Sequence, residues 1–169
     1  MELVLNDGNV AAGATLTVDA SVVLSALDVD GSAETNGAFA LMAGHGPRNF
    51  TGGAGNDFFD ISLESPGLFA SQQGNGGNDT FLYAANFSFN HTVVGGGTGS
   101  DTLEFNGTYT SLAPLSRHLT SIETLKFLGN HSYTGVALTG DIAAGSTLAI
   151  DAGAASNLSP PPCGEVEIS

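Results

Sequence analysis

A glycine- and aspartate-rich nonapeptide occurs three times in this chain at a constant spacing. The three copies span Gly52–Asp60, Gly74–Leu82 and Gly96–Glu104. The aspartates at the sixth position of each copy, Asp57, Asp79 and Asp101, are 22 residues apart. Sequence repeats of about 20–50 residues are typical of solenoids, in which each repeat forms one coil and stacks on the next. We therefore expect a solenoid with a coil of about 22 residues.

Apolar residues alternate with polar ones in short runs before and within these repeats. The clearest pairs are Leu16 and Val18, Leu27 and Val29, and Phe39 and Leu41. A period of two predicts half-buried strands, and pairs that recur at about half the length of a coil predict two strands per coil. The expected fold is all-β, a parallel β-roll or β-helix. Apolar residues in one phase of the period should stack in an internal row: Phe59, Phe81, Leu103 and Leu125.

The residue types in the nonapeptide are suited to binding calcium. Glycine permits backbone angles that turn carbonyl oxygens toward one point, and Ca²⁺ takes about six to eight oxygens from carboxylates and carbonyls. Adjacent coils lie about 4.8 Å apart, so we expect one ion between Asp57 and Asp79 and another between Asp79 and Asp101. The expected ligand positions are Asp57, Asp79, Asp101, Gly52, Ala54, Gly55, Gly74, Gly76, Gly77, Gly96, Thr98 and Gly99.

Two segments resemble the nonapeptide but lack its features. Residues 43–51 keep two glycines and Phe50 but carry Arg48 in place of the aspartate, so no calcium is expected on that side chain. This segment should lie on the side of the coil opposite Gly52–Asp57. Glu123 follows Asp101 by 22 residues without the glycines, and a solvated turn carboxylate is favoured over a partial calcium ligand.

The charge balance restricts the partners. The 169 residues contain three basic and 17 acidic side chains, for a net charge of −14. Nucleic acids and anionic membranes attract basic surfaces, so neither is an expected partner, whereas bound cations would relieve the charge. No apolar run approaches the length of a membrane span. Cys163 is the single cysteine, which excludes a disulfide within the chain, and Met1–Asp7 has no features of a cleaved signal peptide.

The expected organisation is one solenoid domain over residues 1–158, with residues 43–126 as its calcium-binding coils. Residues 159–169 contain three consecutive prolines, which cannot donate to a sheet, and are expected to be a tail that is disordered or was introduced by cloning. Ala11–Ala20, before the first motif, resembles Ala143–Ala152, after the last one. This similarity indicates one unit of a larger array, with end-to-end self-association or tandem neighbours.

The three nonapeptides resemble the glycine- and aspartate-rich repeats of RTX (hemolysin-type) calcium-binding proteins. The resemblance implies a parallel β-roll with calcium between stacked turns. It also implies export by a bacterial type I secretion system, and hence a secreted or cell-surface location. Repeats of the family run in unbroken tandem, two nonapeptides to a coil, which makes their coils shorter than those expected here. In this chain residues 43–51 and 65–73 lack the aspartate that a second row of ions would need.

The expected function is structural, a calcium-binding segment of a secreted or cell-surface bacterial protein in which calcium drives folding. No G-x-S-x-G or H-E-x-x-H motif occurs, and the four histidines lack short metal-ligand spacing. The three basic residues are too few for a polyuronate-degrading enzyme, so the chain is not expected to be an enzyme. Two alternatives remain: an adhesin or carbohydrate-binding module, and an accessory domain of a secreted polysaccharide-active enzyme. An exposed row of aromatic side chains would favour glycan binding.

Overall fold

The computed structural model describes residues 1–46, 48–87, 91–94, 99–109, 119–133, 149–153 and 157–158. The proline-rich segment 159–169, and with it Cys163, lies outside these ranges, as do Gly96 and Thr98. No helix long and apolar enough to cross a membrane is present in the described ranges. In chain order, the strands are β1 (Glu2–Asn6), β2 (Thr15–Asp19), β3 (Leu27–Ala33), β4 (Ala38–Met42), β5 (Arg48–Thr51), β6 (Phe58–Asp60), β7 (Ala70–Gln73), β8 (Thr80–Tyr83), β9 (His91–Val94), β10 (Thr102–Phe105), β11 (Leu119–Thr120), β12 (Thr124–Phe127), β13 (Ser132–Tyr133), β14 (Ala149–Asp151) and β15 (Asn157–Leu158).

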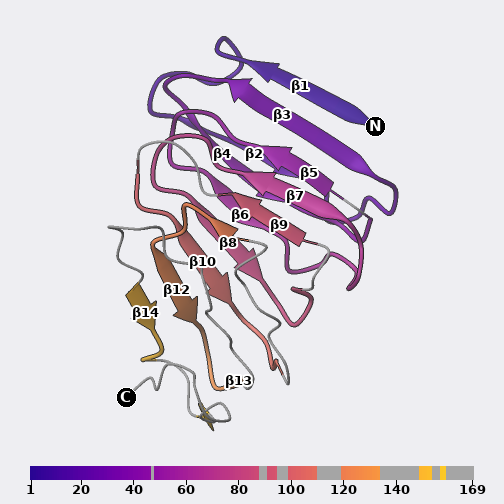
Figure 1. Cartoon of the computed structure of the whole chain (residues 1–169). Helices are drawn as coiled ribbons and strands as arrows, with labels where there is room; N and C mark the ends of the chain where they lie inside the picture. Colours follow the sequence, from indigo (N-terminus) through magenta and orange to yellow (C-terminus); the bar gives the residue numbers. More distant parts are fainter. Residues whose placement is uncertain are drawn as a thin grey trace.

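Successive strands alternate between two parallel sheets, so the chain winds as a solenoid (Figure 1). One sheet has the order β1-β3-β5-β7-β9-β11, and the other has the order β14-β12-β10-β8-β6-β4-β2. Strands β13 and β15 form a separate parallel pair. The expected all-β parallel solenoid with coils of about 22 residues is confirmed.

The register of the seven-stranded sheet confirms the internal row of apolar side chains that the sequence predicts. Phe59 pairs with Phe81, Phe81 with Leu103, and Leu103 with Leu125. All four side chains are fully buried, and the rings of Phe59 and Phe81 stack with centroids 4.8 Å apart. Because the side-chain period of a strand is two, a slip of one residue would turn the whole row to the outside. The phase of the repeat therefore sets the register.

One coil is shorter than the repeat predicts. Asp57 lies 18 residues after its neighbour in the previous coil, Phe39, whereas Asp79 lies 22 residues after Asp57. In the shorter coil, residues 43–51 follow β4 directly and are followed at once by Gly52. The later coils contain a four-residue insertion, residues 61–64 directly after β6 in one and residues 83–86 in the next, where Tyr83 is still the last residue of β8. The insertion therefore determines the coil length.

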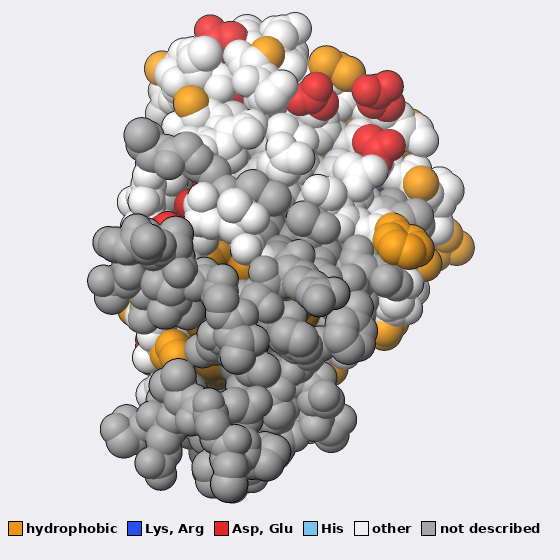
Figure 2. Space-filling model, in the orientation of Figure 1, with side chains coloured by type: hydrophobic (Ala, Val, Ile, Leu, Met, Phe, Trp, Pro, Cys, Tyr) orange, Lys and Arg blue, Asp and Glu red, His pale blue; other side chains and the backbone are white. Residues whose placement is uncertain are grey.

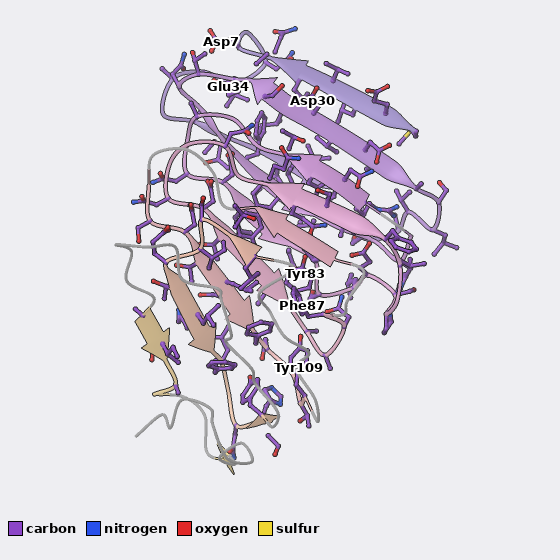
Figure 3. The ribbon with its side chains drawn as sticks, in the orientation of Figure 1. Asp7, Asp30, Glu34, Tyr83, Phe87 and Tyr109 are labelled. Carbon is purple, nitrogen blue, oxygen red and sulfur yellow. The ribbon has the colours of Figure 1, made fainter. Side chains whose placement is uncertain are left out.

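The interior between the sheets contains polar as well as apolar side chains. Gln72 pairs with Phe50 in the shorter sheet and is fully buried. Its Oε1 accepts a hydrogen bond from the hydroxyl of Tyr83, and its Nε2 donates to the carbonyl of Arg48 at 3.4 Å. Tyr83, Phe87 and Tyr109, labelled in Figure 3, belong to an aromatic cluster that continues along the solenoid. Pairing of the polar atoms makes this burial tolerable.

Candidate metal centre

The glycine-rich turns stack along one edge of the solenoid. Residues 52–57 connect β5 to β6, and residues 74–79 connect β7 to β8. Residues 99–101 lead into β10. The same edge in the coil before contains Glu34, which directly follows the C-terminal end of β3 (Figure 3). The parallel register of the strands therefore places the described parts of the three motif turns next to one another, as predicted.

The motif aspartates form a continuous ladder of hydrogen bonds between coils. Asp57 N donates to Asp79 Oδ1, and Asp79 N donates to Asp101 Oδ1, both at 2.8 Å. The ladder begins at Phe39 N, which donates to Asp57 Oδ1 at 2.6 Å. It continues to Glu123, whose Oε2 accepts from Asp101 N at 2.8 Å. Each carboxylate thus accepts a hydrogen bond from the backbone N–H of the equivalent residue one coil earlier in the chain. Hydrogen bonds to charged acceptors are strong.

The second carboxylate oxygens of Asp57 and Asp79 differ. Asp57 Oδ2 accepts a hydrogen bond from Gly53 N at 2.8 Å. Asp79 Oδ2 is buried and has no hydrogen-bond partner. At the position of Gly53, the second motif has Asn75, with a left-handed φ of 70°. A buried acceptor without a partner is unfavourable, so Asp79 presents an oxygen that a cation would satisfy.

Burial opposes the negative charge of both aspartates. It raises the pKa of Asp79 to about 7, with hydrogen bonding from Asp57 N lowering it and the charges of Asp57 and Asp101 raising it further. Burial also raises the pKa of Asp57 to about 6, against the bonds from Phe39 N and Gly53 N, and Glu34 adds repulsion. Without a nearby positive charge, the folded chain therefore favours the protonated carboxyls.

The glycines serve close packing more than unusual backbone angles, which corrects the reason expected from the sequence. Of the described motif glycines, only Gly77 has a positive φ, at 100°. At Gly52 and Gly74 an added Cβ would overlap the Oδ2 atoms of Asp57 and Asp79, respectively. Glycine here leaves room for the carboxylate to fold back over its own turn.

A second column of glycines stacks directly between coils. An added Cβ on Gly55, Gly77 or Gly99 would overlap the carbonyl of the glycine one coil earlier; for Gly55 that neighbour is Gly37. The carbonyls of Gly55 and Gly77 therefore lie against the next coil. This close packing explains why the fourth residue of the nonapeptide is glycine.

The remaining predicted ligands lie nearby, with some of their carbonyls already in use. Gly52 O accepts from Asn75 Nδ2 at 2.8 Å, and Gly53 O accepts from Gly76 N at 3.1 Å. Ala54 is exposed and stacks under Gly76. No group of three or more histidine, cysteine, aspartate or glutamate side chains suited to a metal occurs in the described part of the chain. An ion at this edge would therefore depend on backbone carbonyls, each with a second lone pair, beside one or two carboxylates.

Three features of the edge were missed by sequence reasoning. Glu123 is half-buried and extends the ladder, although a solvated carboxylate was favoured; its spacing of 22 residues was the signal. Asn56 Oδ1 accepts from Asn78 N at 2.7 Å, and Asn78 Oδ1 accepts from Ser100 N at 2.8 Å, in a parallel ladder. The asparagine before the aspartate in two motifs could have indicated it.

Glu34 is the third feature of the edge, and no sequence repeat predicted its position there. Its side chain is buried, and its Oε1 accepts hydrogen bonds from Asn36 N at 3.0 Å and Gly37 N at 2.8 Å. Its Oε2 is buried without a hydrogen-bond partner. Gly53 packs directly against the Glu34 side chain. Glu34 therefore adds a second buried, unpartnered carboxylate oxygen to this edge, one coil before Asp57.

The opposite edge contains a cation from the chain itself. Arg48 is fully buried, and its guanidinium donates to the carbonyl of Val23 at 2.6 Å and to the carbonyl of Ser25. Burial lowers the pKa of Arg48, whereas the negative charges of Glu64 and Asp28 raise it. As expected, this segment lies across the coil from the motif turns, and its arginine occupies a carbonyl-lined turn.

Comparisons of the chain with protein-family models, with curated proteins and with solved structures found no match.

Proposed function

We propose that this chain is a calcium-binding structural segment, an RTX-like β-roll, of a secreted or cell-surface bacterial protein. Calcium would stabilise the fold by neutralising the buried carboxylates of the motif edge. The observation that carries the proposal is the buried Asp79 Oδ2, which lacks a hydrogen-bond partner and lies in a row of stacked carboxylates.

The described side chains offer no positive charge for this row. Only Arg48 and Lys126 are basic within the described ranges. Arg48 binds carbonyls at the opposite edge, and Lys126 Nζ lies 2.8 Å from Glu104 Oε1. Buried charges are costly unless they are paired or bind a metal. The compensating charge would therefore come from solution, and the net charge of −14 favours cation uptake.

Calcium suits the donors at this edge. Asp57, Asp79 and Asp101 supply carboxylates, and the stacked turns supply backbone carbonyls, the hard oxygen donors that Ca²⁺ prefers. The bound ion would supply positive charge and cross-link the coils. The chain's own residues then hold the turns in place through the aspartate and asparagine ladders. The glycine spacing and the RTX resemblance support secretion and a cell-surface location.

The described surface gives no specific support to a glycan-binding module. Its large exposed hydrophobic side chains are Met1, Val4, Val22, Leu24, Leu63 and Phe69. Phe69 is the one aromatic among them, so no aromatic row is seen on the described part of the chain. Figure 2 shows acidic side chains gathered over β1 and β3.

Thermal unfolding followed by circular dichroism tests the proposal. We expect millimolar calcium to raise the melting temperature above its value in chelator, since a ligand at 100 times its Kd stabilises the native state by about 2.7 kcal/mol. Magnesium should act more weakly, because it requires a stricter octahedral shell. Equal melting temperatures in calcium and in chelator would contradict the proposal.

An isosteric variant localises the effect. Asp79→Asn keeps an oxygen that can accept the hydrogen bond from Asp57 N but removes the charge, so we expect it to lose most of the calcium response. Asp60→Asn is the matched control, since Asp60 ends β6, away from the motif turn that precedes this strand, and accepts a local hydrogen bond from Ser62 N at 2.9 Å. The control should keep the response of the unmodified chain.

A further inference from the structure

The two edges of the seven-stranded sheet carry nearly the same sequence in the same phase. Strand β2 is the first strand of this sheet and β14 the last. Thr15-Leu16-Thr17-Val18-Asp19 in β2 matches Thr147-Leu148-Ala149-Ile150-Asp151, of which the structure describes Ala149–Asp151. The similarity seen in the sequence therefore connects two strands at opposite ends of one sheet (Figure 1).

The matching residues also occupy the same register row. Val18 pairs with Leu41, and Leu41 pairs with Phe59, the start of the internal row. At the other end, Leu125 pairs with Ile150. Because Ile150 is the sequence match of Val18, the six strand steps from β2 to β14 return to an equivalent residue in an equivalent position.

The local structure after the matching residues is also the same. Asp19 Oδ1 accepts a hydrogen bond from Ser21 N at 2.9 Å. Asp151 Oδ1 accepts one from Gly153 N at 3.0 Å. Both aspartates thus terminate their strands with the same side-chain turn. Strand β2 therefore has apolar residues at the same positions as β14 and ends in the same turn, so it could take the place of β14 in the sheet.

The charges at the two edges differ in one respect. Asp151 pairs in register with Lys126 of β12. The hydrogen bond and charge of Glu104, followed by the charge of Asp151, raise the pKa of Lys126. Asp19 has Met42 as its register partner in β4 and, among the described strands, no neighbour on its other side. Among the described strands, Asp19 of β2 therefore has no lysine-bearing strand beside it, whereas Asp151 of β14 lies beside Lys126.

We propose that the free edge of β2 displaces β14 and binds strand β12 of a second copy of this chain, in the register that β14 has within one copy. Val18 would lie over Leu125 and Asp19 beside Lys126 of the other copy. The incoming β2 has five residues, whereas the β14 strand that it replaces has three. Half-buried Leu16 and Val18 become covered, and the backbone groups of five-residue β2 gain partners in exchange for those that three-residue β14 loses. This inference depends on the solenoid fold and not on the metal centre.

The contact is heterologous, so it does not close on itself. Once β14 is displaced, each copy would offer β12 at one end and β2 at the other, and copies would add in one direction. Head-to-tail contacts of this kind produce open chains unless a rotation closes them. The expected species are therefore oligomers whose size increases with concentration.

Site-specific cross-linking tests the register. In a Cys163→Ser background, Thr17→Cys is placed in one protein and Thr124→Cys in another, and a short bifunctional thiol reagent is added to the mixture. Thr17 is the sequence match of Ala149, the register partner of Thr124. Thr80→Cys is the matched control, because Thr80 holds the same position in β8, a strand with neighbours on both sides.

We expect the Thr17–Thr124 mixture to form at least about tenfold more cross-linked pairs than the Thr17–Thr80 mixture. Equal yields, or no cross-linked pairs at the highest concentration, would overturn the proposal. Circular dichroism of each variant establishes that the fold is intact.

Sedimentation velocity across a concentration series tests the charge pair without new cysteines. Asp19→Lys should weaken association about tenfold or more by placing a lysine beside Lys126. Asp30→Lys makes the same charge change at a residue with the same kind of local bond, from Ser32 N at 3.0 Å, in the other sheet. It should leave association unchanged. A chain that stays monomeric, or variants that associate equally, would refute the proposed contact.

Discussion

Asp79 lies in the middle of the carboxylate row, with Asp57 one coil before it and Asp101 one coil after it. Its Oδ1 and its backbone N–H each bond to a neighbouring coil, and its Oδ2 is buried without a hydrogen-bond partner. Arg48 is the contrasting residue on the opposite edge, where a guanidinium binds the carbonyls directly. One edge thus contains its own cation, and we propose that the other obtains calcium from solution.

Alanine substitutions should rank the aspartates by their share in calcium binding. If Asp79 serves two ions, Asp79→Ala should remove about twice the calcium-dependent stability lost in Asp57→Ala or Asp101→Ala, about 5 against about 2.7 kcal/mol at 100 times the Kd. Chemical denaturation of each variant in calcium and in chelator gives these differences. Equal losses in all three variants would show that Asp79 has no special position.

The raised pKa values of Asp57 and Asp79 predict an unusual pH dependence without metal. Folding favours their protonated forms, so this contribution to stability is fully present below the ordinary aspartate pKa. It is lost as the pH rises to about 6 for Asp57 and about 7 for Asp79. In chelator, the unfolding free energy should therefore decrease between pH 4 and pH 7.5. The decrease should be on the order of several kcal/mol, as proton linkage predicts.

Calcium should reverse this trend, because metal binding requires the deprotonated carboxylates. Unfolding free energies measured across pH in calcium and in chelator should diverge above about pH 6. Asp79→Asn, which cannot titrate at this position, should flatten the curve in chelator. Parallel curves in the two solutions would argue against both the buried charges and their role in binding.

At the scale of the strands, the repeat predicted most of what the structure shows. The spacing of Phe59, Phe81 and Leu103 set the register because a strand has a period of two and one side of each sheet is buried. The shorter coil before Asp57 could have been predicted from the missing insertion after β4. The burial of Gln72 and Arg48 could not, since it depends on hydrogen-bond partners in the neighbouring coil, 24 and 25 residues away in the sequence.

Phe81 tests the stacked row at this scale. It is fully buried, and its neighbours in the row are Phe59 and Leu103. Phe81→Ala should lower the unfolding free energy by about 3–5 kcal/mol through lost burial and a cavity. Thr80→Ala, one residue away on the outer side of the same strand, should cost much less. Denaturation of both variants in calcium provides the comparison, and similar losses would refute the assigned register.

For the whole molecule, the sequence predicted the position of the candidate site better than it predicted the contacts within the site. The constant period of the motifs placed the three aspartates at one edge. It did not indicate that each carboxylate would bond to the backbone of the next coil, or that Glu34 would join them. These contacts follow from the stacking distance between coils, and Glu34 belongs to the shorter coil, where the period changes.

An anomalous difference map from crystals grown in calcium tests the central claim most directly. We predict peaks along the edge formed by the motif turns, with one ion about 2.3–2.6 Å from Asp79 Oδ2. A well-ordered Asp79 with no peak at this edge would contradict the account and leave the carboxylate row as a metal-free hydrogen-bond ladder.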